Sequence, residues 1–255
     1  MTSTKSKPSK FKVVGTRPIR HDGVDKVTGK AQYSADIHLP GLLAGVVVRS
    51  PYAHARIKHI DTSSAAAHPD VRAIVTYEDL APFEPVGRTV PVGFTVNENI
   101  FAAKKALYKG HPVVAVAATS LDAAEEAASL IKIDYEPLPP VTNLEEALAD
   151  DATVIHDHWT ESDDPQVSGN IACHEQYNLG DIDKGFAEAD QIFEQEYTTK
   201  RVHQGYIEPH SATAWWTPEG KVTIWCSSQG HFQIRDNTAR IIGTTISKVK
   251  VIPME

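Results

Sequence analysis

A glutamine stands where a strand pattern runs directly into a helix pattern. The segment 225–232 reads WCSSQGHF, with Gln229 at the junction. The first turn of a helix has backbone N–H groups without an intrahelical partner and carries the positive end of the helix dipole. Gly230, His231 and Phe232 could therefore face an oxyanion or phosphate, with the neutral Gln229 amide beside them as a donor. A glutamine between a strand and a helix is more often a solvated loop residue or a local cap, so the rest of the chain must decide.

Both flanking segments support such a junction. Residues 221–225 alternate with period two and are rich in β-branched and aromatic side chains, which favours a strand. Residues 232–242 follow helical spacing, and Gly243 stands where a glycine commonly ends a helix. Proteins that alternate strands and helices bind ligands at such carboxyl ends of strands.

The charge balance and hydropathy exclude some classes of protein. The 255 residues carry 25 Lys and Arg against 33 Asp and Glu, a net charge of −8, and the one weakly basic run lies within residues 5–10. This argues against nucleic acid as the main partner. No window approaches about 18 consecutive apolar residues, and no hydrophobic segment follows the N-terminal lysines. We expect a cytoplasmic protein that neither spans a membrane nor carries a standard export signal.

Other reactive residue types lack the spacing that their chemistry needs. Cys173 and Cys226 are far apart without a Cys-x-x-Cys pair, so they cannot form a four-cysteine iron–sulfur or zinc site and are expected as reduced core thiols. A Gly-x-Ser-x-Gly elbow, a Walker loop and a Gly-x-Gly-x-x-Gly motif are all absent. Serine hydrolysis and nucleotide binding therefore have little support.

Two histidine pairs could each supply two metal ligands, namely His156 with His158 and His203 with His210. No third and fourth ligand stand at recognised spacing, and 12 histidines make such pairs common by chance, so no specific zinc site is predicted. Three tryptophans fall on strand patterns and are expected in the core or an interface: Trp215, Trp216 and Trp225.

The remaining patterns predict an α+β chain in two groups of elements. The first group has strands at 42–49, 55–60, 71–77, 112–118 and 131–135, with a short helix after residue 61 and a helix at 121–130 capped by Ser120. A linker with a short helix at 144–149 follows. The second group begins with a strand from Ile171 and a short helix at 181–189. It continues with a long strand region at 191–206, a strand ending at Trp216, strands at 221–225 and 249–252, and a helix from Gly230 between those last two.

Several motifs resemble the large, molybdenum-binding subunit of the xanthine dehydrogenase/aldehyde oxidase family. VGTRPIR at 14–20 and DGVDKVTGKAQY at 22–33 resemble its opening. RSPYAHARI, VRAIVT and the helix and strand of 121–135 resemble its a/b hammerhead domain. HQGYIEP at 203–209 and WCSSQ at 225–229 resemble the start of its molybdopterin-binding domain. The match runs in order over nearly all of residues 14–255.

This resemblance implies a domain organisation and a chemistry. It implies a disordered lead at 1–13, a hammerhead domain at 14–145, a linker at 146–169 and the N-terminal part of a mixed α/β molybdopterin-binding domain at 170–255. The implied reaction hydroxylates an aldehyde or heteroaromatic carbon with oxygen from water. The implied cofactor is molybdenum–molybdopterin, in the cytosine dinucleotide form of bacterial members, and electrons leave through two 2Fe-2S clusters, usually to FAD.

The resemblance also assigns site residues. Gln229 matches the glutamine near the molybdenum oxo ligand, and Gly230, His231 and Phe232 join it as cofactor-binding residues, with no direct metal ligand among them. Glu208 precedes a proline at a strand end, so we expect a structural role there more than acid–base chemistry.

Other parts of the family's machinery have no counterpart before Glu255, including a Gly-Gly-Gly-Phe-Gly loop, the substrate pocket and the catalytic glutamate. We therefore expect no complete catalytic set here, and three partners: the complementary C-terminal part of the molybdenum subunit, a small 2Fe-2S subunit and an FAD subunit. A small molecule of unknown identity is the expected substrate. The alternatives are a non-catalytic assembly module of the same fold that holds no molybdenum, and a truncated fragment with poor solubility.

Overall fold

The computed structural model describes residues 11–81, 96–157, 169–171 and 177–254. Most of the predicted disordered lead, together with Cys173 and His158, lies outside these ranges. The chain forms two compact units. One comprises Met1–His38, Pro209–Arg235 and Lys248–Glu255, and the other comprises Leu39–Glu208 and Asp236–Ser247. Helices and strands are mixed in both, which confirms the predicted α+β class.

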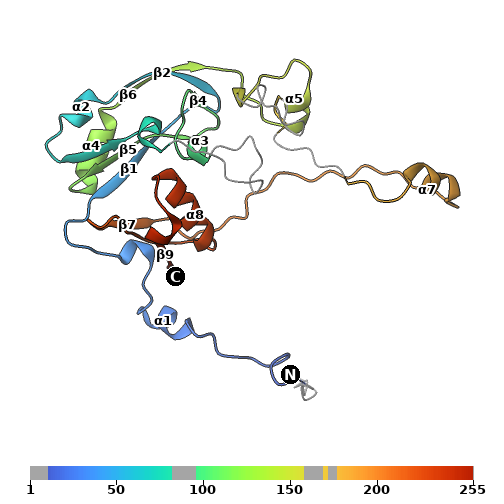
Figure 1. The fold of residues 1–255 in the computed structure, drawn as a ribbon, viewed down its shortest axis with the longest axis horizontal. Helices are drawn as coiled ribbons and strands as arrows, with labels where there is room; N and C mark the ends of the chain where they lie inside the picture. Colours follow the sequence, from blue (N-terminus) through green and yellow to red (C-terminus); the bar gives the residue numbers. More distant parts are fainter. Residues whose placement is uncertain (1–10, 82–95, 158–168, 172–176, 255) are drawn as a thin grey trace, which may run out of the picture. The chain divides into compact units, whose positions relative to one another are not determined.

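The larger unit contains two three-stranded antiparallel sheets (Figure 1). In the first sheet the strands lie in the order β1 (Ala44–Arg49), β5 (Pro112–Ala118), β3 (Val71–Val75). In the second the order is β4 (Lys105–Ala106), β2 (Ala55–Asp61), β6 (Lys132–Pro137). All of these strands except β4 were predicted from the sequence.

The core of the larger unit is built around β5. Val116 of β5 is buried with Ala65 of α2 (Ser63–Ala66) and Ala127 of α4 (Leu121–Ser129). Alanine has the highest helix propensity, which favours helices in these alanine-rich segments. Its small side chain on the inner faces also lets both helix backbones pack closely on the sheet. Ser120 caps α4 as predicted, because its Oγ accepts the Ala123 N–H at 3.2 Å.

Shorter elements complete the description: α1 (Gly23–Thr28), η1 (Ser34–Asp36), η2 (Tyr77–Asp79), α3 (Val96–Ile100), α5 (Leu144–Leu148), α7 (Ile182–Glu188) and η3 (Ile246–Lys248). The sequence predicted α5 and α7 but gave no indication of α1. Within the described ranges, every helix is too short or too polar to cross a bilayer.

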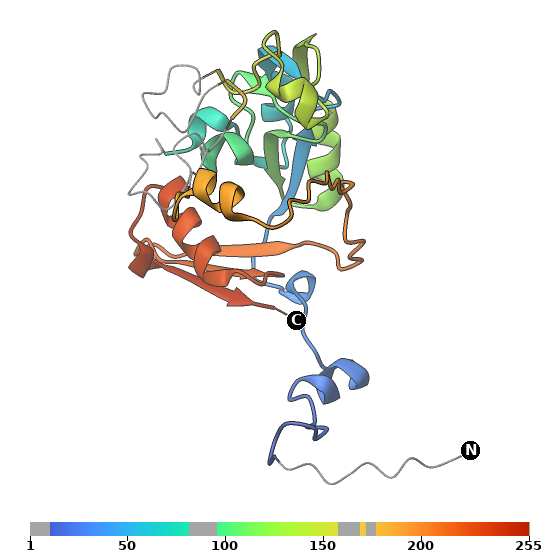
Figure 2. The same cartoon turned by 90° about the vertical axis from the view of Figure 1, so that its right-hand side faces the viewer.

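The smaller unit contains one three-stranded sheet, whose strands run side by side in both views (Figures 1 and 2). Its order is β7 (Ala212–Trp216), β8 (Val222–Cys226), β9 (Val249–Pro253), with β7 antiparallel and β9 parallel to β8. Because β8 and β9 are parallel, the chain must cross over between them, and α8 (His231–Ile241) lies in that crossover. Gly243 follows the helix with a φ of 66°, the left-handed geometry predicted for it.

One sequence prediction about strands is wrong. Residues 191–206 form no strand, because a strand needs a hydrogen-bonded neighbour and none lies beside this stretch in the part of the chain described. Trp215 and Trp216 are 53% and 57% exposed, because they lie on β7 at the edge of its sheet. They are therefore not core residues of this sheet, and their predicted alternative role in an interface stays a prediction.

A buried neutral histidine makes the larger unit sensitive to pH. His111 is fully buried, its Nδ1 accepts the Leu107 N–H at 3.1 Å, and its Nε2 lies 2.6 Å from the Glu98 carbonyl oxygen. The proton must therefore be on Nε2, where it is donated to that carbonyl. Burial lowers the pKa of His111, because a charged imidazolium in this position would be desolvated.

The contribution of His111 to stability should be complete above its unfolded pKa of about 6.5 and should be lost as the pH falls toward its lower folded pKa. Urea unfolding at about pH 7.5 and about pH 5.5 measures this loss. His111→Gln is the control, because a glutamine amide can keep both hydrogen bonds without titrating. An equal loss of stability in both proteins would show that His111 is not the sensitive group.

Candidate functional site

Both neighbouring strands fix the carboxyl end of β8. On one side the Ser227 N–H donates to the Ser211 carbonyl at 3.4 Å, and on the other the Met254 N–H donates to the Cys226 carbonyl at 3.0 Å. Cys226 itself is 5% exposed, and burial raises the pKa of its thiol, so it is an unreactive core residue as predicted. The residues that follow, beginning with Gln229, are therefore presented from a well-anchored strand end.

Gly230 is the residue from which helix α8 begins. Its carbonyl accepts the Ile234 N–H at 3.0 Å, and its own N–H donates to Ser228 Oγ at 2.9 Å. The Gly230 N–H is thus already satisfied. The N–H groups available to a ligand are those of the first helical turn, from His231 onward. This role of Ser228 was not predicted from the sequence, although a serine just before a helix is a recognisable capping signal.

The side chains at this helix start are open to solvent and favour an anion. Gln229 is exposed, and Phe232 is 65% exposed. The Phe232 ring lies 4.4 Å from the His231 ring, and the Arg235 guanidinium lies 5.3 Å from the centre of the Phe232 ring. The start of this 11-residue helix therefore has the positive end of the dipole, with the neutral Gln229 amide before it and the Arg235 cation one turn into the helix. This donor set fits an anionic cofactor with phosphate groups.

The packing of this chain does not explain the glycine at position 230. A Cβ placed there would come no closer than 3.7 Å to another atom, namely Oε1 of Gln233, which is ordinary contact. The backbone φ of Gly230 also lies outside the left-handed region that requires glycine. A close approach by a group from outside the chain is one reason for a glycine at such a place.

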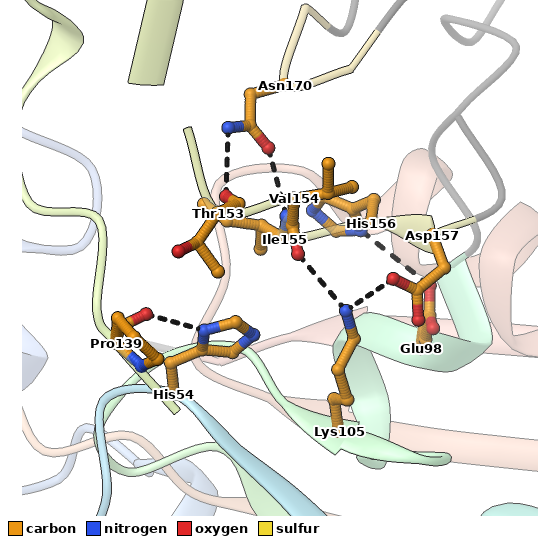
Figure 3. Close-up of polar contacts among 10 residues, drawn as sticks. All are labelled: His54, Glu98, Lys105, Pro139, Thr153, Val154, Ile155, His156, Asp157 and Asn170. Atoms are coloured by element: carbon orange, nitrogen blue, oxygen red, sulfur yellow. Dashed lines mark hydrogen bonds and ion pairs between the residues drawn. The ribbon is translucent and has the colours of Figure 1, made fainter. Parts of the chain in front are cut away.

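A second polar cluster lies in the larger unit, where the segment after α5 returns to the β4 strand (Figure 3). Lys105 is 7% exposed, and its Nζ donates to Asp157 Oδ1 at 2.8 Å and to the Val154 carbonyl at 3.2 Å. Beside it, His156 Nδ1 lies 3.8 Å from a carboxylate oxygen of Glu98. These contacts connect residues 154–157 to strand β4 and helix α3.

Asn170 and His54 extend this cluster. The Asn170 amide accepts the Ile155 N–H at 2.9 Å and donates to two carbonyls, each at 3.1 Å, one of them that of Thr153. His54 is 4% exposed, and its Nδ1 lies 2.9 Å from the Pro139 carbonyl oxygen (Figure 3). Neither residue was predicted from the sequence as part of a site. Their hydrogen-bond partners are far away in the sequence, so no local sequence pattern predicts these contacts.

The other sequence candidates do not converge on a site. His203 Nδ1 accepts the Gly205 N–H at 3.0 Å, a local turn contact. Glu208 is exposed in an extended stretch, and His156 belongs to the cluster around Lys105. Among the described residues, no three His, Cys, Asp or Glu side chains are placed to hold a metal ion.

Two family profiles match the chain. Residues 28–139 match the aldehyde oxidase and xanthine dehydrogenase a/b hammerhead domain, and residues 163–255 match the molybdopterin cofactor-binding domain. The second profile contains the whole β8–α8–β9 crossover and Gln229. The chain belongs to the aldehyde oxidase and xanthine dehydrogenase family. It corresponds to the N-terminal portion of the molybdenum-binding subunits in that family.

Curated relatives and solved structures agree with this family assignment. A probable xanthine dehydrogenase subunit of Bacillus subtilis (strain 168) is 30% identical over 92% of this chain and 29% of its own length. The nicotinate dehydrogenase large molybdopterin subunit of Eubacterium barkeri is 30% identical over 95% of this chain and 53% of its own length. Quinoline 2-oxidoreductase from Pseudomonas putida 86 matches with a TM-score of 0.75 and 26% identity over 94% of this chain and 30% of that one.

The chain therefore spans between about a third and about half of the length of these family members. The fold class and family predicted from the sequence are confirmed by these matches. The cofactor-binding role of Gln229 and the three residues after it stays a prediction.

Proposed function

We propose that this chain is the N-terminal part of the molybdenum–molybdopterin subunit of a hydroxylase that oxidises an aldehyde or heteroaromatic carbon. The observation that carries the proposal is an exposed, anion-favouring helix start inside the segment matched by the molybdopterin cofactor-binding profile. Two names among the relatives and solved structures, nicotinate dehydrogenase and quinoline 2-oxidoreductase, support a heteroaromatic substrate.

In this proposal the residues around Gln229 hold and orient the cofactor. The bound molybdenum–molybdopterin would supply the two-electron oxidation that protein side chains alone cannot perform. The first-turn N–H groups of α8 and the Arg235 guanidinium stabilise its negative charge. Gln229 donates a hydrogen bond without adding a negative charge of its own. Gly230 lets the cofactor approach the backbone closely.

The remaining parts of the enzyme are proposed to lie on other polypeptide segments. They are the complementary C-terminal part of the molybdenum subunit, a small protein with two 2Fe-2S clusters and an FAD protein, all in the cytoplasm. The pterin is proposed to carry a cytosine dinucleotide. The chain covers 53% of the Eubacterium barkeri relative but 29% of the Bacillus subtilis relative, so molybdenum subunits of this family differ in length. This variation supports a molybdenum subunit that is split over more than one polypeptide.

The molybdenum and pterin content of the purified protein tests the proposal. The full chain purified alone should contain neither, whereas the complex isolated from its native host should contain both in near-equal amounts with the chain. Metal analysis by mass spectrometry and fluorescence of the oxidised pterin measure the two. A stable complex that holds partners but neither molybdenum nor pterin would overturn the proposal in favour of a non-catalytic assembly module.

A further inference from the structure

One segment of the larger unit exposes a continuous series of large apolar side chains. This segment, residues 177–207, comprises α7 and the extended stretch after it (orange in Figure 1) and is called the docking arm below. Its large apolar side chains are exposed by between 53% and 98%: Tyr177, Leu179, Ile182, Phe186, Ile192, Phe193, Tyr197, Val202, Tyr206 and Ile207. Single exposed apolar residues are ordinary, but a contiguous set of this size marks an interaction surface.

The backbone of the docking arm is also unpaired over a long stretch. Residues 190–205 contain no helix or strand, and within the described ranges no backbone–backbone hydrogen bond connects them to another residue. Their sequence nevertheless predicts a strand, because β-branched and aromatic residues recur along it. Extended backbone with strand-type side chains and N–H and C=O groups outside any ladder is suited to adding a strand to the edge of another sheet.

The docking arm also presents an apolar hollow. Helix α7 and the residues after it line a hollow of about 340 Å³ that is largely open to solvent. Apart from Gln191, its lining is apolar or glycine: Ile182, Gly185, Phe186, Ala189, Ile192 and Phe193. A space of this size accepts a large aliphatic or aromatic side chain, the kind of anchor around which tight interfaces form.

The family matches indicate which partner covers the arm. The molybdopterin cofactor-binding profile over residues 163–255 contains the whole arm. The match to the solved quinoline 2-oxidoreductase chain covers 94% of this chain and 30% of that one, so about 70% of the longer chain lies outside the match. The arm therefore belongs to a domain of which the relatives contain much more than this chain covers.

We propose that the docking arm adds a strand to a sheet edge of the complementary part of the molybdenum subunit. Residues 190–205 form the strand, and an apolar side chain of that partner fills the hollow beside α7. This inference rests on the proposed function, because it takes the partner to be the remainder of a molybdopterin-binding subunit. It goes further by naming the segment and the mode of docking.

Hydrogen exchange on the full chain tests this directly. The tagged chain is purified from its native host, and the polypeptides bound to it are identified by mass spectrometry. In the isolated chain the amides of residues 190–205 should exchange at nearly unprotected rates. In the complex with a polypeptide of molybdopterin-binding sequence they should become strongly protected. Protection in the isolated chain, protection through a second copy of this chain, or no protection in that complex would each overturn the inference.

Two variants provide a matched comparison. Phe193 and Tyr197 are 88% and 82% exposed, so F193D with Y197D should leave unfolding of the isolated chain unchanged. Because anchor residues dominate interface energetics, the pair should weaken the complex by roughly a hundredfold or more. The control is L144D on α5, where Leu144 is 72% exposed outside the arm, and it should bind as the unaltered chain does. Equal binding by F193D/Y197D and the unaltered chain would contradict the proposal.

The inference and the proposed function can fail separately. A complex that contains molybdenum but leaves residues 190–205 unprotected would overturn the docking arm and keep the enzyme. A complex that protects the arm but contains no molybdenum would keep the docking mode and overturn the enzyme.

Discussion

Replacing Gln229 with alanine should lower the turnover rate of the assembled enzyme by roughly a hundredfold to a thousandfold, the usual effect of removing one pre-positioned hydrogen-bond donor from a reaction centre. The fold should be unaffected, because the Gln229 side chain is exposed and β8 is anchored through Ser211 and Met254. Gln229→Glu should lose at least as much activity, since it brings a negative charge beside an anionic cofactor. The assay is dye reduction with a panel of aldehydes and nitrogen heteroaromatics.

Gln233 provides the matched control for Gln229. It is also an exposed glutamine, the third residue of α8, and replacing its side chain leaves the backbone N–H groups of the first turn unchanged. Gln233→Ala should retain nearly full turnover with the same molybdenum content. A Gln229→Ala enzyme that turns over at the unaltered rate would show that this amide takes no part in the reaction. A loss of molybdenum without a change of turnover per molybdenum would assign Gln229 to cofactor retention alone.

Removing the charge of Asp157 should destabilise the larger unit, whereas removing the charge of Lys105 should not do so to the same degree. Asp157→Asn leaves a buried ammonium with neutral partners, which should cost about 1–3 kcal/mol of unfolding free energy. Lys105→Met replaces the ammonium with an apolar end, and the Asp157 side chain, 67% exposed, can be solvated. The expected loss is below about 1 kcal/mol, because buried ion pairs are often replaceable by apolar residues.

Urea unfolding of both single variants and the double variant measures the coupling between Lys105 and Asp157. The double variant should resemble Lys105→Met, since no buried charge then remains without its partner. An exposed pair on α7, Lys184 and Glu188 at 3.8 Å, is the control, and Glu188→Gln should change stability by no more than about 0.5 kcal/mol. If Lys105→Met destabilised the unit more than Asp157→Asn, the buried-charge explanation would be wrong.

The elements that the sequence predicted correctly are those with local signals. Strand β5 is a continuous apolar run, α4 begins with a serine that caps it, and α8 ends at a glycine with positive φ. Each of these signals operates within a few residues of the chain. The βαβ crossover that contains Gln229 could be anticipated for the same reason.

Features that depend on distant partners could not be predicted in this way. Strand β4 has only two residues, and Lys105 within it is buried because Val154 and Asp157, some fifty positions away, supply its acceptors. The docking arm has the composition of a strand, yet pairing depends on a neighbour that the described residues do not provide. Composition predicts which backbone favours an extended conformation, but only tertiary contacts decide whether it pairs.

The central claim is that the start of α8 lies at the molybdenum cofactor, and a cryo-electron microscopy map of the cofactor-loaded complex tests it most directly. The account predicts the cofactor beside Gly230, with the Gln229 amide nitrogen within about 3.2 Å of a cofactor atom. Cofactor density at another part of the complex, with Gln229 facing solvent, would contradict it.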